Sequence, residues 1–501
     1  LDRWSQREKL SNMPLDCTFV YGPTRVIYNA GGQYSGSPWH APGFNTPLGN
    51  VCDYLVTFPE DDRFLGEEDA TLQWPGNGGG DSTYQREQTA YWLAEQMGLP
   101  YCYRRTINLF VNGVRRGEMF EDAQQPNGDM AQEYWSEGDN GDLHKIQIWF
   151  EFDDAASTFA AQGASLANFS TTGGQKKLAV YRWTFAKRAV HGSVNNYSNL
   201  FALVNTANYP GLGANYRRQL ESTIDVDNWL KTYAVEHIVG NSDSFAYGGG
   251  QNMYTYKPLG DTWKMLIWDI DFAFAAQEPF SDVFAGIGRS NGIDLAEPAY
   301  RRRYWQILQD LANGPLNGLQ LNPWLDAKYS AMIANGRSVE NPISIKNYVS
   351  QRRTYLLNLI STNVPATFAI TLNNGNGFST GQSLINLTGT APIEVRTITI
   401  NGVAFPVTWT SPTTWSAQVA LSAGTNALLV QGWGSASNAV AGATATIPIN
   451  YTGVAELPQD KLVLHEIMYH PALPDASFIE IFNTSSNNAF DLSGWRLNGA
   501  D

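Results

Sequence analysis

Hydrophobic and polar positions recur with two different periods along residues 1–364. Apolar residues every three or four positions, as in DVDNWLKTYAVEHIVG (225–240), predict an amphipathic helix that Asp225 caps and Gly240 ends. Alternating runs predict strands. The predicted helices cover 82–97, 225–240 and 344–360, and the predicted strands cover 107–113, 145–152, 253–257 and 264–274. Helices and strands without a regular βαβ rhythm indicate an α+β domain.

The pattern changes near residue 364. From 365 to 455 the charged residues are Glu394 and Arg396 alone, and short alternating runs are separated by turn sequences. This is typical of a small antiparallel β-sandwich of the Ig-like type. The clearest signals are the runs 395–400 and 415–421 and the Asn-Gly pair at 401–402.

Alternating runs return in the last part of the chain, as LVLHEIMYHP (462–471), FIEIFNTS (478–485) and DLSGWRL (491–497). Their spacing resembles the opening strands of the lamin-tail domain, an Ig-like module. Such a module needs about a hundred residues. We therefore expect 456–501 to be its truncated start.

Composition narrows the classes of function. The 501 residues carry a formal charge of −14 without a basic block, which argues against nucleic acid and anionic membranes as partners. The chain contains no run of 18 apolar residues, so no transmembrane helix is predicted. The chain begins at Leu1, so removal of an N-terminal segment stays open. The spacing of Cys17, Cys52 and Cys102 excludes a Cys-rich zinc site and leaves one disulfide or three free thiols open.

Two aspartates, Asp269 and Asp271, interrupt the apolar run MLIWDIDFAFA (265–275). On a strand they would share one face, where like charges repel unless a cation lies between them or one takes a proton. The alternative is that one of them caps a turn or pairs with an arginine.

A polar loop precedes that run. Asp243 and Asn252 lie in NSDSFAYGGGQNMYTYKP (241–258), between a predicted helix and a predicted strand, where catalytic groups are often placed. The alternative is a solvated turn. The order Asp243, Asn252, Asp269 is similar to that of protein kinases, in which an acid near the hydroxyl precedes an amide and an aspartate on the metal.

The run GNSDS…QNMYTYK…GDTWKMLIWDIDFAF resembles the CotH kinase family, the spore-coat-type atypical protein kinases. The elements DSTYQREQTAYWLAEQMGLPYCYRRTINLFVNGVRRGE, GDLHK, STIDVDNWLKTYAVEHIVGN and EPAYRRRYWQIL are similar to further motifs of that family in the same order, so the resemblance covers about residues 15–362. We expect a CotH kinase-like domain over 1–364, then an Ig-like module over 365–455 and the lamin-tail segment over 456–501.

The resemblance implies ATP and Mg²⁺ as cofactors and a role for each matching residue. Lys145 would contact phosphate, and Asp243 would be the acid near the acceptor hydroxyl or a metal ligand. Asn252 and Asp269 would hold Mg²⁺ with Asp271 beside them. Glu121 and Asp122 are both candidates for the acid that pairs with Lys145 and so supports nucleotide binding.

Two residues depart from the family's pattern: His144 replaces the aromatic residue before the lysine, and Ile267 replaces a proline. The glycine-rich WPGNGGGDST (74–83) is neither GxGxxG nor a Walker A motif.

The resulting hypothesis is an Mg²⁺-dependent kinase for Ser or Thr of an exported or surface protein, located outside the cell or in its envelope. Its expected partners are a nucleotide and a protein substrate. Two alternatives are a non-catalytic kinase-like adhesion protein and a carbohydrate-active protein that uses Asp243 and Asp269 as paired acids. The oligomeric state, the acceptor protein and the division of roles among the aspartates stay open.

Overall fold

The computed structural model describes residues 13–35, 53–76, 80–135, 141–153, 158–188, 193–435, 437–454, 456–471, 476–486, 488–490, 492 and 495–497. They form two compact units, Leu1–Tyr300 with Ile307–Leu359 and Arg301–Gln306 with Ile360–Asp501. The boundary between Leu359 and Ile360 falls inside helix α11 (Ile343–Asn363), a few residues before the predicted boundary at 364, and residues 365–501 lie in one unit.

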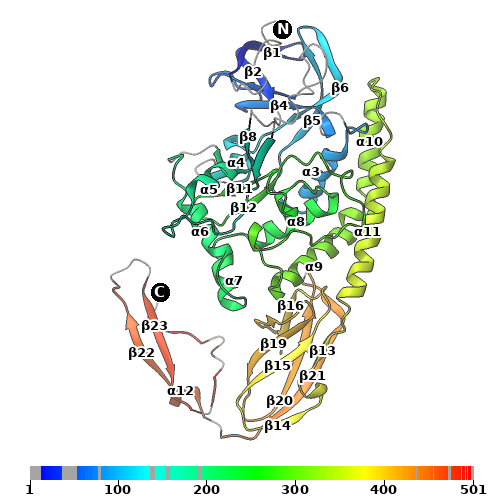
Figure 1. Ribbon diagram of the computed structural model, residues 1–501. Helices are drawn as coiled ribbons and strands as arrows, with labels where there is room; N and C mark the ends of the chain where they lie inside the picture. The colour runs from blue at the N-terminus through cyan, green and yellow to red at the C-terminus, as the bar shows by residue number, and fades with distance from the viewer. Residues whose placement is uncertain are drawn as a thin grey trace. The chain divides into compact units, whose positions relative to one another are not determined.

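The first unit begins with an antiparallel sheet of six strands in the order β1-β2-β3-β4-β6-β5 (Figure 1). Phe58, Phe64 and Phe120 belong to the hydrophobic cluster that packs on it. The strands are β1 Leu15–Tyr21, β2 Arg25–Ser35, β3 Asp53–Thr57, β4 Asp69–Gln73, β5 Arg104–Val111 and β6 Val114–Ala123.

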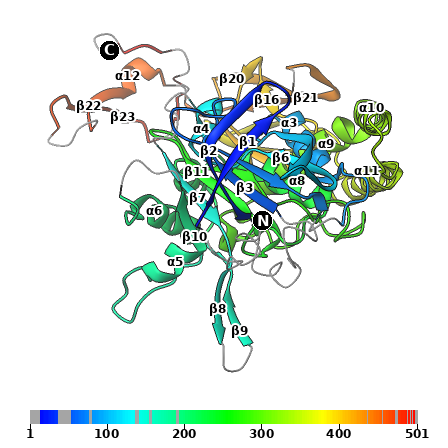
Figure 2. The same cartoon turned by 90° about the horizontal axis from the view of Figure 1, so that it is seen from above.

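A second sheet, of four strands in the order β10-β7-β11-β12, carries Lys145 on β7, and Asn252 directly precedes β11. All its pairings are antiparallel. The strands are β7 Asp142–Ile146, β10 Phe185–Arg188, β11 Met253–Lys257 and β12 Lys264–Ile267. A separate hairpin, β8 Trp149–Asp153 with β9 Thr158–Gln162, projects from this unit in Figure 2. The strand predicted over 145–152 is therefore two strands in two sheets.

Helices complete the first unit. They are α3 Arg86–Gln96, α4 Gly128–Tyr134, α5 Leu178–Thr184, α6 Ser198–Ala207, α7 Ala214–Glu221, α8 Val226–Val239, α9 Pro298–Asn313, α10 Leu321–Ala334 and α11 Ile343–Asn363, with single 3₁₀ turns at η2 Phe245–Tyr247, η3 Arg289–Asn291 and η4 Pro315–Asn317. Residues 301–306 of α9 and 360–363 of α11 belong to the second unit. Both views show α10 and α11 side by side (Figures 1 and 2). All three predicted helices exist as α3, α8 and α11. None of the helices in the described part of the chain combines the length and hydrophobicity that a membrane crossing requires.

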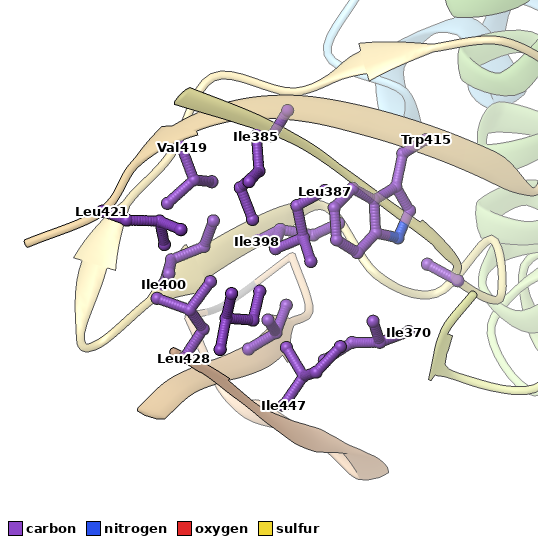
Figure 3. Packing of buried hydrophobic residues seen from close by; sticks show 14 of the residues in the cluster. Ile370, Ile385, Leu387, Ile398, Ile400, Trp415, Val419, Leu421, Leu428 and Ile447 are labelled. Carbon is purple, nitrogen blue, oxygen red and sulfur yellow. The ribbon is translucent and has the colours of Figure 1, made fainter. Parts of the chain in front are cut away.

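The second unit contains two further sheets that share one core. Alternate residues of each sheet point inward, and Figure 3 shows Leu387, Trp415, Ile398 and Ile447 converging there. The strands are β13 Ala369–Ile370, β15 Leu384–Thr390, β19 Thr414–Ala420 and β18 Thr408–Trp409 in one sheet, and β14 Phe378–Thr380, β21 Ala439–Tyr451, β20 Gly424–Trp433, β16 Thr397–Ile400 and β17 Val403–Ala404 in the other.

The sequence signals in this unit have structural counterparts. The run 395–400 contains β16 and the run 415–421 coincides with most of β19. Asn401 and Gly402 have φ of 52° and 81°, the left-handed conformation that a two-residue hairpin between β16 and β17 requires. The Ig-like assignment itself stays a prediction.

A two-stranded hairpin follows, formed by β22 Leu462–Met468 and β23 Phe478–Asn483 after the short helix α12 Pro458–Lys461. Both strands lie within the predicted runs. The third run, 491–497, lies partly outside the described residues, so the lamin-tail assignment also stays a prediction.

Candidate active site

The loop after helix α8 brings Asp243 and Asn252 together. Asp225 caps α8 by accepting the Asn228 amide, and Gly240 ends it with φ of 73°. The loop then returns to β11, and Asn252 donates its amide to Asp243 Oδ2 at 3.0 Å while Gln251 donates to Asp243 Oδ1 at 2.6 Å. Two neutral donors therefore fix the carboxylate.

The glycines in this loop allow the backbone to pass close to Asp243. A Cβ atom on Gly249 would lie 3.0 Å from the Asp243 carbonyl group, and one on Gly250 would lie 2.8 Å from the Ala164 nitrogen. Gly250 also has φ of 73°. Larger residues at these positions would open the loop that carries Asp243.

Asp269 and Asp271 are not on a strand. The predicted strand 264–274 is wrong beyond Ile267, where β12 ends. Asp269 has φ of 53°, which aspartate tolerates better than most residues, and turn hydrogen bonds begin at Ile270. Because the extended backbone stops there, strand alternation does not place the two carboxyl groups on one face.

Lys145 lies in the middle of the second sheet. Its strand β7 pairs with β10 and β11, so Ala186 and Tyr254 are its direct neighbours across the sheet. Burial lowers the pKa of Lys145, and the charge of Asp269 partly reverses that effect. The lysine and Asp269 therefore interact electrostatically, although they are far apart in the sequence.

Several acids from distant parts of the chain share the electrostatic field of Asp269. Burial, reinforced by the charge of Asp269, raises their pKa values. The pKa is about 7 for Asp53 and Glu87 and about 8 for Glu236. The pKa of Asp243 is raised, and that of Asp271 is well above its usual value. Carboxyl groups gathered in this way favour the binding of a cation or of protons.

The two candidate partners of Lys145 pair with other residues. Glu121 Oε2 and Glu87 Oε2 each lie 2.7 Å from the same nitrogen, NH1 of Arg104. Asp122 pairs with Arg105 at 2.5 Å. Both acids are on β6, where the antiparallel register places Asp122 directly opposite Arg105 and Glu121 opposite Thr106, two residues along β5 from Arg104. The expectation that one of them also supports Lys145 stays a prediction.

His144, the departure from the family's aromatic residue, behaves as an aromatic residue here. Its ring centroid lies 5.6 Å from those of Tyr197 and Trp263, and its Nδ1 lies 2.9 Å from the Phe185 carbonyl oxygen. Burial lowers the pKa of His144 to about 4, so the ring is neutral near pH 7. His144 therefore packs among aromatic rings on the same strand as Lys145.

Sequence reasoning missed Asp53, Glu87 and Glu236. The residues around Asp53 and Glu87 do not mark them as site residues, because contacts between distant parts of the chain bring them within the electrostatic influence of Asp269. Glu236 had one: it follows Trp229 by seven residues and Tyr233 by three, which places an acid on the apolar face of the helix.

The donor atoms at the site suit a hard divalent cation. Asp269, Asp271 and the carbonyl oxygen of Asn252 are the kinds of oxygen ligand that Mg²⁺ prefers, usually with one or two carboxylates and substrate phosphates. In the described residues no group of three or more His, Cys, Asp or Glu side chains is arranged to hold a metal. A cation here would combine carboxylate and amide oxygens with water or phosphate oxygens.

Comparison with known families assigns most of the chain to one family. The family model described as CotH kinase protein matches residues 54–359, more than half of the chain, and this range contains every residue of the candidate site except Asp53. A comparison with curated proteins found no match. The chain therefore belongs to the CotH kinase protein family.

Proposed function

We propose that this protein is an atypical kinase that transfers the γ-phosphate of ATP to Ser or Thr hydroxyls of an exported or surface protein, with Mg²⁺ as the metal. The observation that carries the proposal is the fixed Asp243–Asn252 pair beside Asp269 and Lys145. Phosphoryl transfer needs positioning and charge stabilisation rather than a covalent protein intermediate, and these four groups can supply both.

Each group has one role in the proposal. Asp243, held by two amide donors, orients the acceptor hydroxyl and takes its proton. Lys145 contacts the phosphates. Asn252 and Asp269, with Asp271 beside them, would hold Mg²⁺, which when bound neutralises charge on the phosphates. Asn252 uses its amide nitrogen for Asp243, so its carbonyl oxygen is the atom suited to a cation.

One observation favours a second candidate, a kinase-like protein that binds nucleotide without transferring phosphate. Protein kinases support the phosphate-contacting lysine with a glutamate. Here Glu121 and Asp122 are engaged by Arg104 and Arg105 instead. A third candidate, a carbohydrate-active protein with Asp243 and Asp269 as paired acids, rests on the sequence alone.

Labelled ATP separates these candidates. The protein is incubated with γ-labelled ATP and Mg²⁺ or Mn²⁺, next to Asp269→Asn and the control Asp61→Asn, an exposed acid in a turn of the first unit. Metal-dependent labelling that Asp269→Asn abolishes and Asp61→Asn preserves supports the kinase. Nucleotide binding without labelling supports the second candidate. Absence of nucleotide binding would refute both.

The location we propose is extracellular or in the cell envelope. The support is the sequence pattern of the β modules after the kinase-like domain. Fractionation of the producing cells, with detection of the full chain by antibody, tests it; a chain found with the cytosolic fraction would contradict it.

A further inference from the structure

Glu236 is a fully buried acid near the C-terminal end of helix α8. Its Oε2 accepts a hydrogen bond of 2.8 Å from the side-chain amide of Asn241, and its Oε1 makes no hydrogen bond within the described residues. A buried carboxyl group that is only partly satisfied costs stability. Packing alone therefore does not explain why this position of an apolar helix face carries an acid.

The partner of Glu236 is the first residue of the Asp243 loop. Asn241 is attached to Glu236 twice, because its backbone nitrogen also donates to the Glu236 carbonyl oxygen at 3.0 Å. The side-chain oxygen of Asn241 is buried and makes no hydrogen bond within the described residues. The side-chain link to Glu236 is thus the one described hydrogen bond that fixes the orientation of the Asn241 side chain.

Backbone hydrogen bonds carry this anchor onward through the loop. The Ser244 nitrogen donates to the Asn241 carbonyl oxygen at 3.3 Å, and the Gly249 nitrogen donates to the Ser244 carbonyl oxygen at 2.9 Å. The Phe245 nitrogen donates to the Gln251 carbonyl oxygen at 2.7 Å. Asp243 lies within the turn that the first of these bonds closes, between Asn241 and Ser244, so its position depends on where Asn241 is held.

We propose that Glu236 is a positioning residue, which sets the conformation of the Asp243 loop through Asn241. This inference rests on the proposed function, in which Asp243 orients the acceptor hydroxyl. Loss of the anchor would displace Asp243 without removing a group that contacts nucleotide. The expected effect is therefore on kcat rather than on nucleotide affinity.

Electrostatics supports a link with the site. Burial raises the pKa of Glu236 to about 8, the hydrogen bond from Asn241 lowers it, and the charge of Asp269 raises it. Glu236 is therefore mostly uncharged near pH 7, and a glutamine at this position keeps both its charge state and its acceptor oxygen.

The matched variants are Glu236→Gln, which keeps an acceptor for Asn241, and Glu236→Leu, which keeps the volume but has no acceptor. We expect Glu236→Leu to lower kcat about tenfold to a hundredfold with unchanged nucleotide Kd, as misplacement of a catalytic group does. Glu236→Gln should stay within about threefold of the natural protein, because its hydrogen bond survives. Wild-type kcat in Glu236→Leu, or an equal loss in both variants, overturns the proposal.

Hydrogen exchange supplies a measurement that does not depend on activity. The Ser244, Phe245 and Gly249 amides should exchange faster in Glu236→Leu than in Glu236→Gln. Asn228→Ala serves as the control. Asn228 is a buried polar residue of the same helix, and its side chain accepts a hydrogen bond from the Met265 nitrogen rather than from the loop. Unchanged loop exchange in Glu236→Leu, or equal acceleration in the control, overturns the proposal.

Two further results keep the outcomes distinct. If Glu236→Leu does not fold, Asn241→Ala removes the same hydrogen bond from the other side and should accelerate exchange of the same amides. If the natural protein transfers no phosphate, the proposed function fails, whereas hydrogen exchange still decides whether Glu236 anchors the loop.

Discussion

Arg104 is the centre of a buried ion network whose removal should be among the most destabilising single changes in the first unit. Its side chain is 1% exposed, and its NH1 lies 2.7 Å from carboxylate oxygens of both Glu87 and Glu121. The guanidinium also lies over the Tyr91 ring, 4.7 Å from its centroid. Substitution by methionine, Arg104→Met, keeps most of the volume and removes the charge.

The cost follows from what the change leaves behind. Glu87 and Glu121 would keep their burial and lose their shared cation, and breaking such a pair costs about 3–5 kcal/mol. The neighbouring Arg105 provides the control, because it is 41% exposed and pairs with one acid, Asp122. Arg105→Met should cost about 1 kcal/mol or less.

The pH dependence gives the prediction a second test. Burial already raises the pKa of Glu87 to about 7 in the folded protein, and Arg104 is the main influence that lowers it. Without Arg104 the folded pKa of Glu87 rises further above its unfolded value of about 4.3. The folded state then binds more protons than the unfolded state, so stability rises as the pH falls through 7. The deficit of Arg104→Met should therefore be smaller at pH 5.5 than at pH 8.

Urea unfolding at these two pH values measures both effects, with hydrogen exchange of β5 and β6 amides reporting on the first unit separately. A deficit for Arg104→Met no greater than that for Arg105→Met would refute the account of the network. A deficit that grows as the pH falls would refute the assigned protonation.

Three other changes have equally definite expectations. The natural protein should lose about 3 kcal/mol of unfolding free energy as the pH falls from 6.5 to 4, because the buried His144, with a pKa of about 4, stays neutral while the histidine of the unfolded chain takes up a proton. His144→Phe should remove this loss, and urea unfolding at pH 7 and 4.5 compares the two proteins. Leu387→Ala, in the core of the second unit, should cost about 2–5 kcal/mol against less than about 1 kcal/mol for the exposed Leu384→Ala on the same strand, measured by thermal unfolding. Lys145→Met should weaken binding of a fluorescent ATP analogue at least about tenfold, whereas Lys231→Met, on the outer side of α8, should not; equal affinities would remove Lys145 from the nucleotide site.

Local patterns predicted the elements whose own residues determine them. Helix α8 follows its apolar spacing, and both its cap at Asp225 and its end at Gly240 occur as expected. Strand β11 has the predicted bounds, 253–257. The segment after Ile267 differs, because hydrophobic runs can form turns when one residue adopts a left-handed conformation, as Asp269 does.

The composition of the site depended on contacts that sequence spacing does not record. The loop 241–252 predicted Asp243 and Asn252 together, and the structure joins them by a hydrogen bond. By contrast, the ion pair between Glu121 and Arg104 joins two strands, and the pairing of β5 with β6, in which Glu121 is opposite Thr106, is not visible in the spacing of either strand.

The raised pKa values at the site have a common origin, so its acids should not act independently. Asp269 raises the pKa of Asp271, Asp243 and Glu236; Glu236 is buried and the two aspartates are partly buried. A cation bound near Asp269 would reverse that influence and favour ionisation of the neighbouring acids. If the proposed cation binds here, its binding would release protons, and its affinity should increase with pH through the range in which these carboxyl groups titrate. The hydrophobic sequence around Asp269 contributes to this coupling, because burial is the largest cause of each raised pKa.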